Sequence, residues 1–378
     1  RGLGDVYKRQ IQPYSPAAGT GLSSHELNQP GCYRDVKDTT VTAQFKVTDE
    51  RASSASLPVY ILAWTTTPWT LPSNTALCVG PKIDYVAVKG RNPYSGEEAI
   101  YLLAESRLSA YFQAEKDDEG NEKPVETLWR GKGADLVGIR YQQLMPWVKP
   151  CALEDGKVVD KEAEAFRVIP GDYVTTEDGT GIVHIAPTFG ADDAKVAKDA
   201  GIPSLFVIDK AGDTRPMVDF TGKYFVQADM NEEFTSLCVR DSYWKHSGDF
   251  VKNAYDPKYN KDGKYDEKAA AKDMDLNVIL CLEMKEEGTA FKIEKHVHNY
   301  PHCWRTDKPV LYYPLDSWFI RSTAKKERMY ELNQTIQWKP ESTGTGRFGK
   351  WLENLNDWNL SRSRYWGTPL PIWRNRDT

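Results

Sequence analysis

The chain alternates short apolar runs with turn-forming residues, a pattern typical of a strand-rich protein. The alternation of Val41–Val47 predicts a half-buried strand, and the β-branched run Val59–Leu62 predicts a buried one. Further strands are predicted at 76–79, 85–88, 99–103, 182–186 and 205–208, and helices near 104–114, from about 193 and over 266–272. Many short strands with few helices favour a mixed, β-rich α/β fold whose main domain is barrel-like.

One stretch concentrates hydroxyl groups directly after the predicted strand that ends near Trp64. It consists of Trp64-Thr65-Thr66-Thr67-Pro68-Trp69-Thr70-Leu71-Pro72-Ser73-Asn74. Each proline keeps the residue before it out of the α region, so a stiff extended or turning loop is expected. Hydroxyls donate and accept hydrogen bonds, which suits a polar substrate or an ordered water. The alternative is that β-branched threonines merely fit an extended edge, but three in succession between Trp and Pro favour a site.

A second group of candidate residues runs from Asp178 to Asp193, where Gly179-Thr180-Gly181 precedes a strand that contains His184. Asp192 is predicted to cap a helix that starts near Asp193. The helix dipole would then favour the ionised form of Asp193, and an ionised carboxylate in a pocket suits an ammonium group. Each feature also has a purely structural explanation, namely a tight turn, a buried strand histidine and a simple helix cap.

Composition and charge narrow the classes of protein. The net charge of −5 does not indicate a strongly basic nucleic-acid-binding protein, although residues 320–378 hold 11 Lys and Arg against 6 Asp and Glu. The six cysteines form no Cys-x-x-Cys pair, which predicts reduced thiols and a cytoplasmic protein. No apolar run is long enough to span a bilayer, so no membrane partner is expected. His296, His298, His302 and Cys303 lack the spacing of a zinc site, so no metal is predicted.

The two groups of candidate residues carry a family resemblance. The threonine-rich stretch at 64–74 resembles a signature of the editing domain of isoleucyl-tRNA synthetases, and the stretch at 178–193 resembles the second signature of that domain. The related valyl and leucyl enzymes carry Thr-Thr-Arg-Pro, so Thr67 indicates the isoleucyl member. Residues 300–305 and 316–319 resemble the return of the chain to the catalytic core. Residues 358–369 resemble a segment of the amino-acid pocket, with Trp366 as the candidate residue there.

The resemblance implies an organisation for the chain. An editing domain over 41–235 would be inserted in a class I synthetase nucleotide-binding (Rossmann-like) fold, of which only part is present. Residues 11–40 would be a connecting segment, and 236–378 the return connection with part of the catalytic domain. Asp5-Val6-Tyr7-Lys8-Arg9-Gln10 resembles the translated end of a sequencing adapter, so residues 1–10 are predicted to be an artefact.

The resemblance also implies an activity, the hydrolysis of valine that has been attached to tRNA(Ile). The implied catalytic residues are Thr65, Thr66, Thr67, His184 and Asp193. The implied substrate-binding residues are Trp69, Thr70, Asn74, Gly179, Thr180, Gly181 and Trp366. Asp193 would bind the α-ammonium group, while His184 and the threonines would exclude isoleucine. The sequence shows no Ser-His-Asp or Cys-His arrangement, so no covalent intermediate is expected.

Two signatures of the adenylate-forming site, His-x-Gly-His and Lys-Met-Ser-Lys-Ser, do not occur in this sequence. The resemblance therefore implies ATP and Mg²⁺ for the complete enzyme, no cofactor for editing, and no activation of isoleucine by this chain alone. The implied partners are tRNA(Ile), valine and isoleucine, and a monomer is expected. Two alternatives stay open: a tRNA-binding module without turnover, and a valyl-type editor that acts on Thr-tRNA.

Overall fold

The fold is given by a computed structural model, which describes residues 5–361 except 53–54, 114, 117–121 and 262–263. The chain divides into two compact units. Residues 13–313 form the larger unit, and residues 1–12 together with 314–378 form the smaller one.

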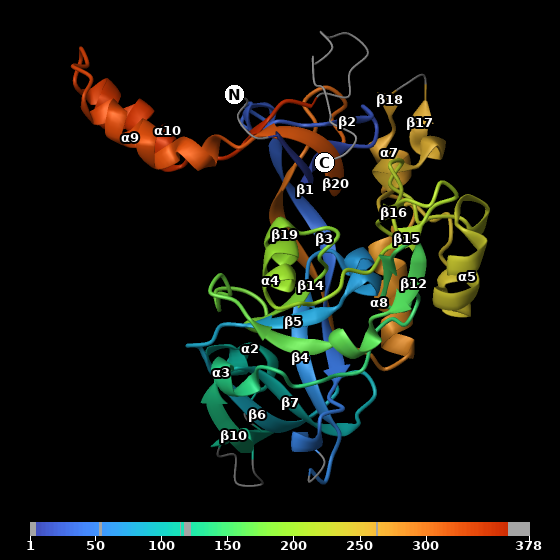
Figure 1. Cartoon of the computed structure of the whole chain (residues 1–378). Coiled ribbons are helices and arrows are strands. Elements are labelled where there is room, and N and C mark those ends of the chain that lie inside the picture. The colour runs from blue at the N-terminus through green and yellow to red at the C-terminus, as the bar shows by residue number, and fades with distance from the viewer. Residues whose placement is uncertain (1–4, 53–54, 114, 117–121, 262–263, 362–378) are drawn as a thin grey trace. The chain divides into compact units, whose positions relative to one another are not determined.

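A nine-stranded sheet dominates the larger unit and curls as half a barrel (Figure 1). Its strands follow the order β10–β6–β7–β4–β14–β5–β13, and β3 pairs with both β4 and β19. Their bounds are β3 Tyr33–Lys46, β4 Val59–Thr65, β5 Ala76–Val79, β6 Asp84–Arg91, β7 Glu98–Ala104, β10 Thr127–Lys132, β13 Arg167–Pro170, β14 Ile182–Ile185 and β19 Ala290–Pro301. The strands predicted between 41 and 103 and at 182–186 are confirmed, and so is the mixed, β-rich class.

Strand β4 changes its neighbour along its length, and this change opens a fork in the sheet. β7 pairs in parallel with Val59–Ile61, whereas β14 pairs in parallel at Trp64. Between these points the hydroxyl of Thr180 donates to Leu62 O at 2.7 Å, and the N–H of Ala104 donates to Thr180 O at 2.9 Å. The loop that precedes β14 therefore fills the fork between β7 and β14.

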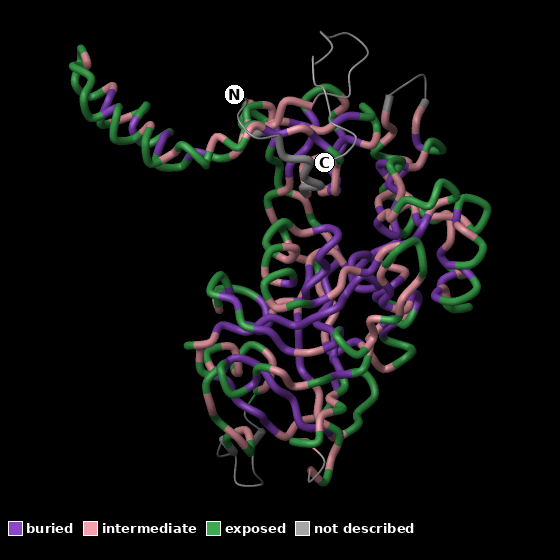
Figure 2. Tube along the Cα trace, in the orientation of Figure 1, coloured by how far each residue is buried: buried purple, intermediate pink, exposed green. Residues whose placement is uncertain are grey.

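Burial follows the central position of these strands (Figure 2). Residues 39–45 of β3 are buried without interruption, so this strand is covered on both faces and is not half-buried as its alternation predicted. One core cluster packs on β4, β6 and β7 and includes Leu62, Val86, Tyr101, Leu103 and Phe291. A second cluster joins β5, β13 and β14 to helix α4 and includes Ala76, Ile169, Ile185, Ala197 and Ile202. All six cysteines are buried and free.

The remaining elements of the larger unit are short. Its helices are α1 Ser24–Leu27, α2 Leu108–Tyr111, α3 Gly133–Leu136, α4 Ala191–Asp199, α5 Glu232–Cys238, α6 Asp241–Trp244, α7 Glu267–Ala270 and α8 Leu276–Glu286. Two-stranded pairs are formed by β11 Cys151–Glu154 with β12 Lys157–Asp160, and by β15 Val207–Ile208 with β16 Thr214–Arg215. The predicted helices near 104–114, from 193 and over 266–272 thus correspond to α2, α4 and α7.

The smaller unit contains strand and helix segments from both ends of the chain. Its elements are β1 Asp5–Ser15 and β20 Leu311–Ile320, which both extend across the unit boundary, with β21 Trp358–Asn359, α9 Lys326–Gln334 and α10 Phe348–Glu353. Gln12 Nε2 donates to Ser317 Oγ at 3.2 Å, and Asn359 Nδ2 donates to Gln12 Oε1 at 2.6 Å. The predicted artefact at 1–10 and the predicted boundaries at 40 and 235 stay predictions.

Candidate functional site

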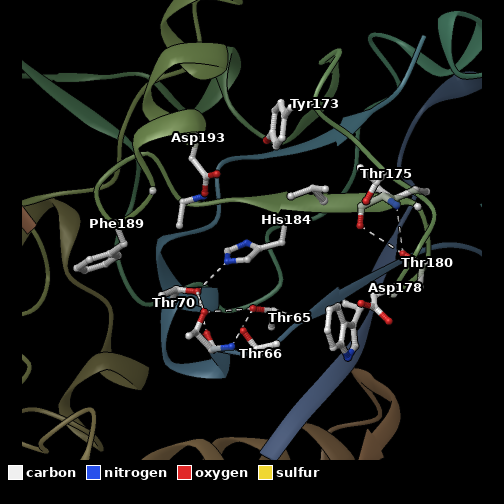
Figure 3. A pocket seen from close by; sticks show the side chains of 18 residues that line it. Thr65, Thr66, Thr70, Tyr173, Thr175, Asp178, Thr180, His184, Phe189 and Asp193 are labelled. Carbon is white, nitrogen blue, oxygen red and sulfur yellow. Dashed lines mark hydrogen bonds between the residues drawn. The ribbon is translucent and has the colours of Figure 1, made fainter. Parts of the chain in front are cut away.

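A cavity of about 440 Å³ lies beside β14 at the end of β4 (Figure 3). It is lined by Trp64, Thr65, Thr66, Thr67, Thr70, Tyr173, Thr175, Asp178, Gly179, Thr180, Gly181, Ile182, Val183, His184, Ala186, Phe189, Gly190 and Asp193. The fold therefore brings the threonine-rich stretch and the stretch at 178–193 to one place. Of the predicted site residues that the structure describes, all line this cavity except Trp69 and Asn74.

The threonines form a hydrogen-bonded array where β4 ends. Thr65 is the last residue of β4, and Thr67 (φ −128°, ψ 70°) precedes the 3₁₀ helix η2, Pro68–Ser73. This turn places Thr70 Oγ1 3.3 Å from Thr67 Oγ1, which in turn lies 3.3 Å from Thr65 Oγ1. Pro68 keeps Thr67 out of the α region, as predicted, and of the two predicted forms, extended or turning, the chain takes the turn, as the 3₁₀ helix Pro68–Ser73. The hydroxyls consequently present one polar surface to the cavity.

His184 is held by the protein on both of its ring nitrogens. Its Nε2 lies 2.9 Å from Thr70 Oγ1, and its Nδ1 lies 3.0 Å from Asn74 Nδ2. The side chain is buried in β14, and this burial lowers the pKa of His184 to about 4. His184 is therefore a neutral, fixed part of the wall at pH 7. It is poorly suited to act as a general base, because neither nitrogen is free to take a proton from a substrate.

Two residues that were predicted to bind substrate lie behind the cavity wall. Asn74 is 2% exposed, and its Nδ2 donates to Ala76 O at 2.8 Å while its Oδ1 accepts a hydrogen bond from the Tyr141 hydroxyl at 2.7 Å. Trp69 is 3% exposed, and its ring meets that of Phe189 edge to face with 4.8 Å between centroids. The 3₁₀ turn points both side chains into the core, so they support the cavity and do not line it.

The Gly179-Thr180-Gly181 sequence shapes the wall through its backbone. Gly179 and Gly181 have φ of 65° and 73°, in the left-handed region that favours glycine. A Cβ on Gly179 would lie 2.9 Å from the Trp64 ring, and one on Gly181 would lie 2.4 Å from Ala104 Cβ. Thr180 is 1% exposed and its hydroxyl is bound to the backbone of β4. Although all three residues border the cavity, their contacts with Trp64, Ala104 and the backbone of β4 hold the cavity wall in place.

Asp193 reaches the cavity from the first turn of α4 (Ala191–Asp199). The N-cap of this helix is Gly190 and not Asp192, which corrects the predicted start. Asp193 Oδ2 accepts a hydrogen bond from the N–H of Ala186 at 2.9 Å. Burial raises the pKa of Asp193 to about 6, although the Ala186 bond acts in the opposite direction. The predicted contribution of the helix dipole stays a prediction, and with a pKa of about 6 the group is still mostly ionised at pH 7.

Sequence reasoning did not select nine of the lining residues, among them Trp64, Tyr173, Thr175, Asp178 and Phe189. Trp64, Asp178 and Phe189 fall inside the two signatures, and their position there was the available signal. Tyr173 and Thr175 lie in an irregular segment before β14. No periodicity or motif marks those two, so only the tertiary structure assigns them to the cavity.

Three predictions concern features beyond the cavity. Trp366 lies outside the described residues. Within the described residues, no group of three or more His, Cys, Asp and Glu side chains is placed to hold a metal ion. His298 Nε2 instead lies 3.0 Å from Asp38 Oδ2, and His302 Nδ1 lies 3.0 Å from Tyr300 O. No helix in the described part of the chain is long and apolar enough to cross a membrane.

Comparison with known proteins decides the family. The family model described as tRNA synthetases class I (I, L, M and V) matches residues 2–378. The chain belongs to this family. The resemblance drawn from the two signatures is thereby confirmed, and it now extends over nearly the whole sequence.

Relatives that carry the name isoleucine–tRNA ligase share substantial identity with the chain. The protein of Bacteroides thetaiotaomicron is 66% identical over an alignment of 377 positions, gaps included, that covers 97% of this chain and 32% of that protein. The protein of Porphyromonas gingivalis is 56% identical over an alignment of 396 positions, gaps included, that covers 99% of this chain and 33% of that protein. The chain thus spans about a third of the length of these class I synthetases. Their names agree with the isoleucyl member that Thr67 indicated.

Solved structures that resemble this chain include editing domains of cytosolic leucyl-tRNA synthetases. The domain from P. knowlesi is 17% identical, with a TM-score of 0.31, over 43% of this chain and 62% of that chain. One from P. falciparum is 12% identical, with a TM-score of 0.31, over 47% of this chain and 77% of that chain.

Proposed function

We propose that the chain is part of an isoleucine–tRNA ligase and carries the site that hydrolyses mischarged Val-tRNA(Ile). The names of the relatives support the ligase, and the cavity supports the hydrolytic site. One observation carries the proposal: the Asp193 carboxylate, the neutral His184 ring and the threonine hydroxyls line the same cavity. A carboxylate and a polar array of this kind suit an amino acid that is esterified to a ribose.

Asp193 supplies the charge that binds the α-ammonium group of the ester. The carboxylate is partly buried, so water screens its attraction to a cation less than it would at an open surface. Among the described residues that line the cavity there is no Lys or Arg to neutralise it. The ammonium group of the substrate therefore completes an ion pair that the protein leaves open.

The rest of the cavity distinguishes valine from isoleucine by size. A hydrophobic pocket separates side chains that differ by one methylene only about 10- to 200-fold, a known limit that isoleucyl-tRNA synthetases themselves exemplify. A second site that admits only the smaller side chain removes the error. Hydrogen bonds run from Thr65 to Thr67, from Thr67 to Thr70, and from Thr70 to His184. The wall that they form is rigid and resists the expansion that isoleucine would require.

The chemistry needs a positioned water and a stabilised oxyanion, because the aminoacyl ester is already activated. Water adds to the ester carbonyl carbon, and collapse of the tetrahedral intermediate expels the ribose hydroxyl of the tRNA and releases valine. The hydroxyls of Thr66 and Thr67 hold the water or the ester, and His184 orients the array through Thr70. No nucleophile with an adjacent base is required, so no covalent intermediate forms.

The proposal extends to the complete ligase, which would charge tRNA(Ile) with isoleucine. ATP and Mg²⁺ would serve that reaction alone, and the editing site would need no cofactor. The proposed partners are tRNA(Ile), valine and isoleucine, in the cytoplasm, and the proposed state is a monomer.

Deacylation assays with Val-tRNA(Ile), Ile-tRNA(Ile) and Thr-tRNA test the proposal. The chain is expected to hydrolyse the valyl ester and to spare the isoleucyl ester. Asp193→Ala should lower kcat/KM for Val-tRNA(Ile) about 10- to 100-fold, because a charged hydrogen-bonding partner of the ammonium is lost. Asp192→Ala is the matched control, since Asp192 lies in the same helical turn but is exposed and does not line the cavity.

The alternatives give different results in the same assays. Hydrolysis of Thr-tRNA with no hydrolysis of Val-tRNA(Ile) would indicate a valyl-type editor. A folded chain that binds tRNA(Ile) but hydrolyses neither ester would indicate a binding module. Equal losses in the Asp192 and Asp193 variants would refute the role given to Asp193.

A further inference from the structure

A chain of hydrogen bonds leads from the protein core to the threonine array. It begins at Tyr141, whose hydroxyl donates to Asn74 Oδ1 at 2.7 Å. Asn74 Nδ2 faces His184 Nδ1 at 3.0 Å, and His184 Nε2 faces Thr70 Oγ1 at 2.9 Å. Thr70 Oγ1 then lies 3.3 Å from Thr67 Oγ1. The first two members of the chain are buried and outside the cavity, whereas the last two face it.

The donor at each step follows from Asn74. Its Nδ2 lies 2.8 Å from Ala76 O, and a carbonyl oxygen can only accept, so the atom at that position must be the amide nitrogen. The same nitrogen therefore donates to His184 Nδ1, which must be unprotonated. The single ring proton of a neutral His184 then resides on Nε2 and is donated to Thr70 Oγ1.

This tautomer sets the acceptor to which the Thr70 hydroxyl donates. Thr70 Oγ1 accepts the proton of His184 and donates its own hydrogen to Thr67 O at 2.8 Å. Thr70 has no second hydrogen, so at the contact between the two hydroxyls Thr67 is the donor. In the opposite tautomer Thr70 would donate to Nε2 and would lose its bond to Thr67 O, while Thr67 would still be the donor to Thr70, whose single hydrogen is used in either case. The position of one proton on His184 thus determines whether the Thr70 hydroxyl donates to the Thr67 carbonyl or to the His184 ring.

We infer that Tyr141 and Asn74 are positioning residues that hold His184 in its Nε2–H tautomer and thereby keep the Thr70 hydroxyl bonded to Thr67 O in the cavity wall. Nδ1–H would point at the amide nitrogen of Asn74, placing two donors face to face in the core, where water cannot intervene. Tyr141 holds Asn74 in the required orientation by donating to its oxygen. The catalytic consequence rests on the proposed function, whereas the tautomer does not.

The neutrality of both groups agrees with this arrangement. Burial lowers the pKa of His184 to about 4, so a second ring proton is absent at pH 7. Burial also raises the pKa of Tyr141 well above its ordinary value, although its bond to Asn74 acts the other way, so the phenol keeps its hydrogen. The donors assigned above therefore hold across the neutral pH range.

Nitrogen NMR of the whole 378-residue chain, labelled in its histidine rings, tests the inference at pH 7.5. Wild-type His184 should show a protonated Nε2 and a bare Nδ1, with its signals assigned by their loss in His184→Gln. In Tyr141→Phe the ratio of Nδ1–H to Nε2–H should rise about fivefold, as expected when one buried hydrogen bond no longer orients Asn74. Tyr243→Phe is the control, because Tyr243 is equally buried and donates to Phe225 O, away from this chain of bonds.

A second variant tests the same inference if Tyr141→Phe does not fold. Asn74→Asp replaces the donor that faces Nδ1 by an oxygen, so the tautomer should reverse to Nδ1–H. A wild-type ring protonated on Nδ1, or an unchanged ratio in a folded Tyr141→Phe protein, would overturn the inference.

Deacylation separates this inference from the proposed function. Asn74→Asp, in which the tautomer reverses, should lower kcat for Val-tRNA(Ile) about fivefold or more with little change in KM, whereas Tyr141→Phe should lower kcat only as far as its Nε2–H fraction falls. A wild-type chain with the expected tautomer but no deacylation would refute the proposed function and leave the tautomer assignment standing. Normal deacylation by a variant whose tautomer has reversed would refute the catalytic consequence.

Discussion

Asp193 Oδ2 accepts a hydrogen bond from the backbone N–H of Ala186 at 2.9 Å. Ala186 directly follows β14, and Asp193 lies in the first turn of α4, so this bond joins the strand that carries His184 to the helix that carries the carboxylate. Burial in the same place raises the pKa of Asp193 to about 6. Folding therefore makes the ionisation of the Asp193 carboxyl less favourable than it is in the unfolded chain.

The proposed hydrolysis should lose activity in mild acid. Because the pKa of Asp193 is about 6, the carboxylate is ionised above this pH and increasingly neutral below it. Binding of the ammonium group should weaken accordingly, and kcat/KM for Val-tRNA(Ile) should fall about tenfold per pH unit well below pH 6. A pH profile between 5 and 8 measures this. A profile that stays flat down to pH 5 would show that Asp193 does not bind the substrate in its ionised form.

Asp193→Asn should stabilise the folded chain at neutral pH. The folded pKa of about 6 exceeds the ordinary value of 3.8, so ionisation destabilises the folded state, fully so above pH 6 and not at all below pH 3.8. Asparagine keeps an oxygen for the Ala186 N–H but carries no charge. We expect the free energy of unfolding at pH 8 to rise by about 1–2 kcal/mol. This is less than the free energy that corresponds to the whole pKa shift of Asp193, because the side chain is partly exposed and water screens its charge.

Urea denaturation of Asp193→Asn and wild type at pH 8 and pH 4 measures this difference. The gain should shrink as the pH falls through 6. A variant that is less stable than wild type at pH 8 would contradict the argument, and would mean that the Ala186 bond depends on the charge.

Gly190→Ala should displace the Asp193 carboxylate. Gly190 has φ −118° and ψ 130°, which alanine adopts without strain, but its Cβ would lie 2.6 Å from Asp193 Cγ. The carboxylate must therefore move, and kcat/KM for Val-tRNA(Ile) should fall about tenfold, as for a misplaced binding group. Ala191→Ser is the control, because Ala191 is the exposed next residue and does not line the cavity. Unchanged kinetics in Gly190→Ala would show that the position of the carboxylate is not critical.

Thr70→Val should destabilise the chain, because it removes the acceptor of the His184 Nε2 proton while keeping the shape of the side chain. A buried donor without a partner costs about 1–3 kcal/mol, so the free energy of unfolding should fall by that amount. Thr75→Val is a matched control, since the Thr75 hydroxyl is fully buried and has no hydrogen-bond partner. Denaturant titration should find Thr75→Val as stable as wild type or more so. Equal losses in both variants would contradict the assigned bond.

The local pattern of the sequence was sufficient to predict most of the elements that build the site. Apolar runs bounded by Pro and Gly located β4, β5, β6, β7 and β14, because strand formation in a buried sheet depends on exactly these short-range preferences for β-branched and aromatic residues. The same reasoning gave the wrong burial for β3. Its alternation predicts one covered face, but β3 lies between β4 and β19, and layers on both faces bury it.

By itself the sequence determined the family, the strands and the hydroxyl-rich stretch that reaches the cavity. Only the tertiary structure decided which side chains face that cavity. Asn74 and Trp69 belong to the same stretch as Thr67, yet the 3₁₀ turn of η2 directs them into the core, where their partners come from distant segments. The tertiary structure also decided the ionisation of Asp193, because burial by the surrounding fold raises its pKa to about 6. Contacts and burial of this kind depend on residues far apart in the chain, which no local pattern records.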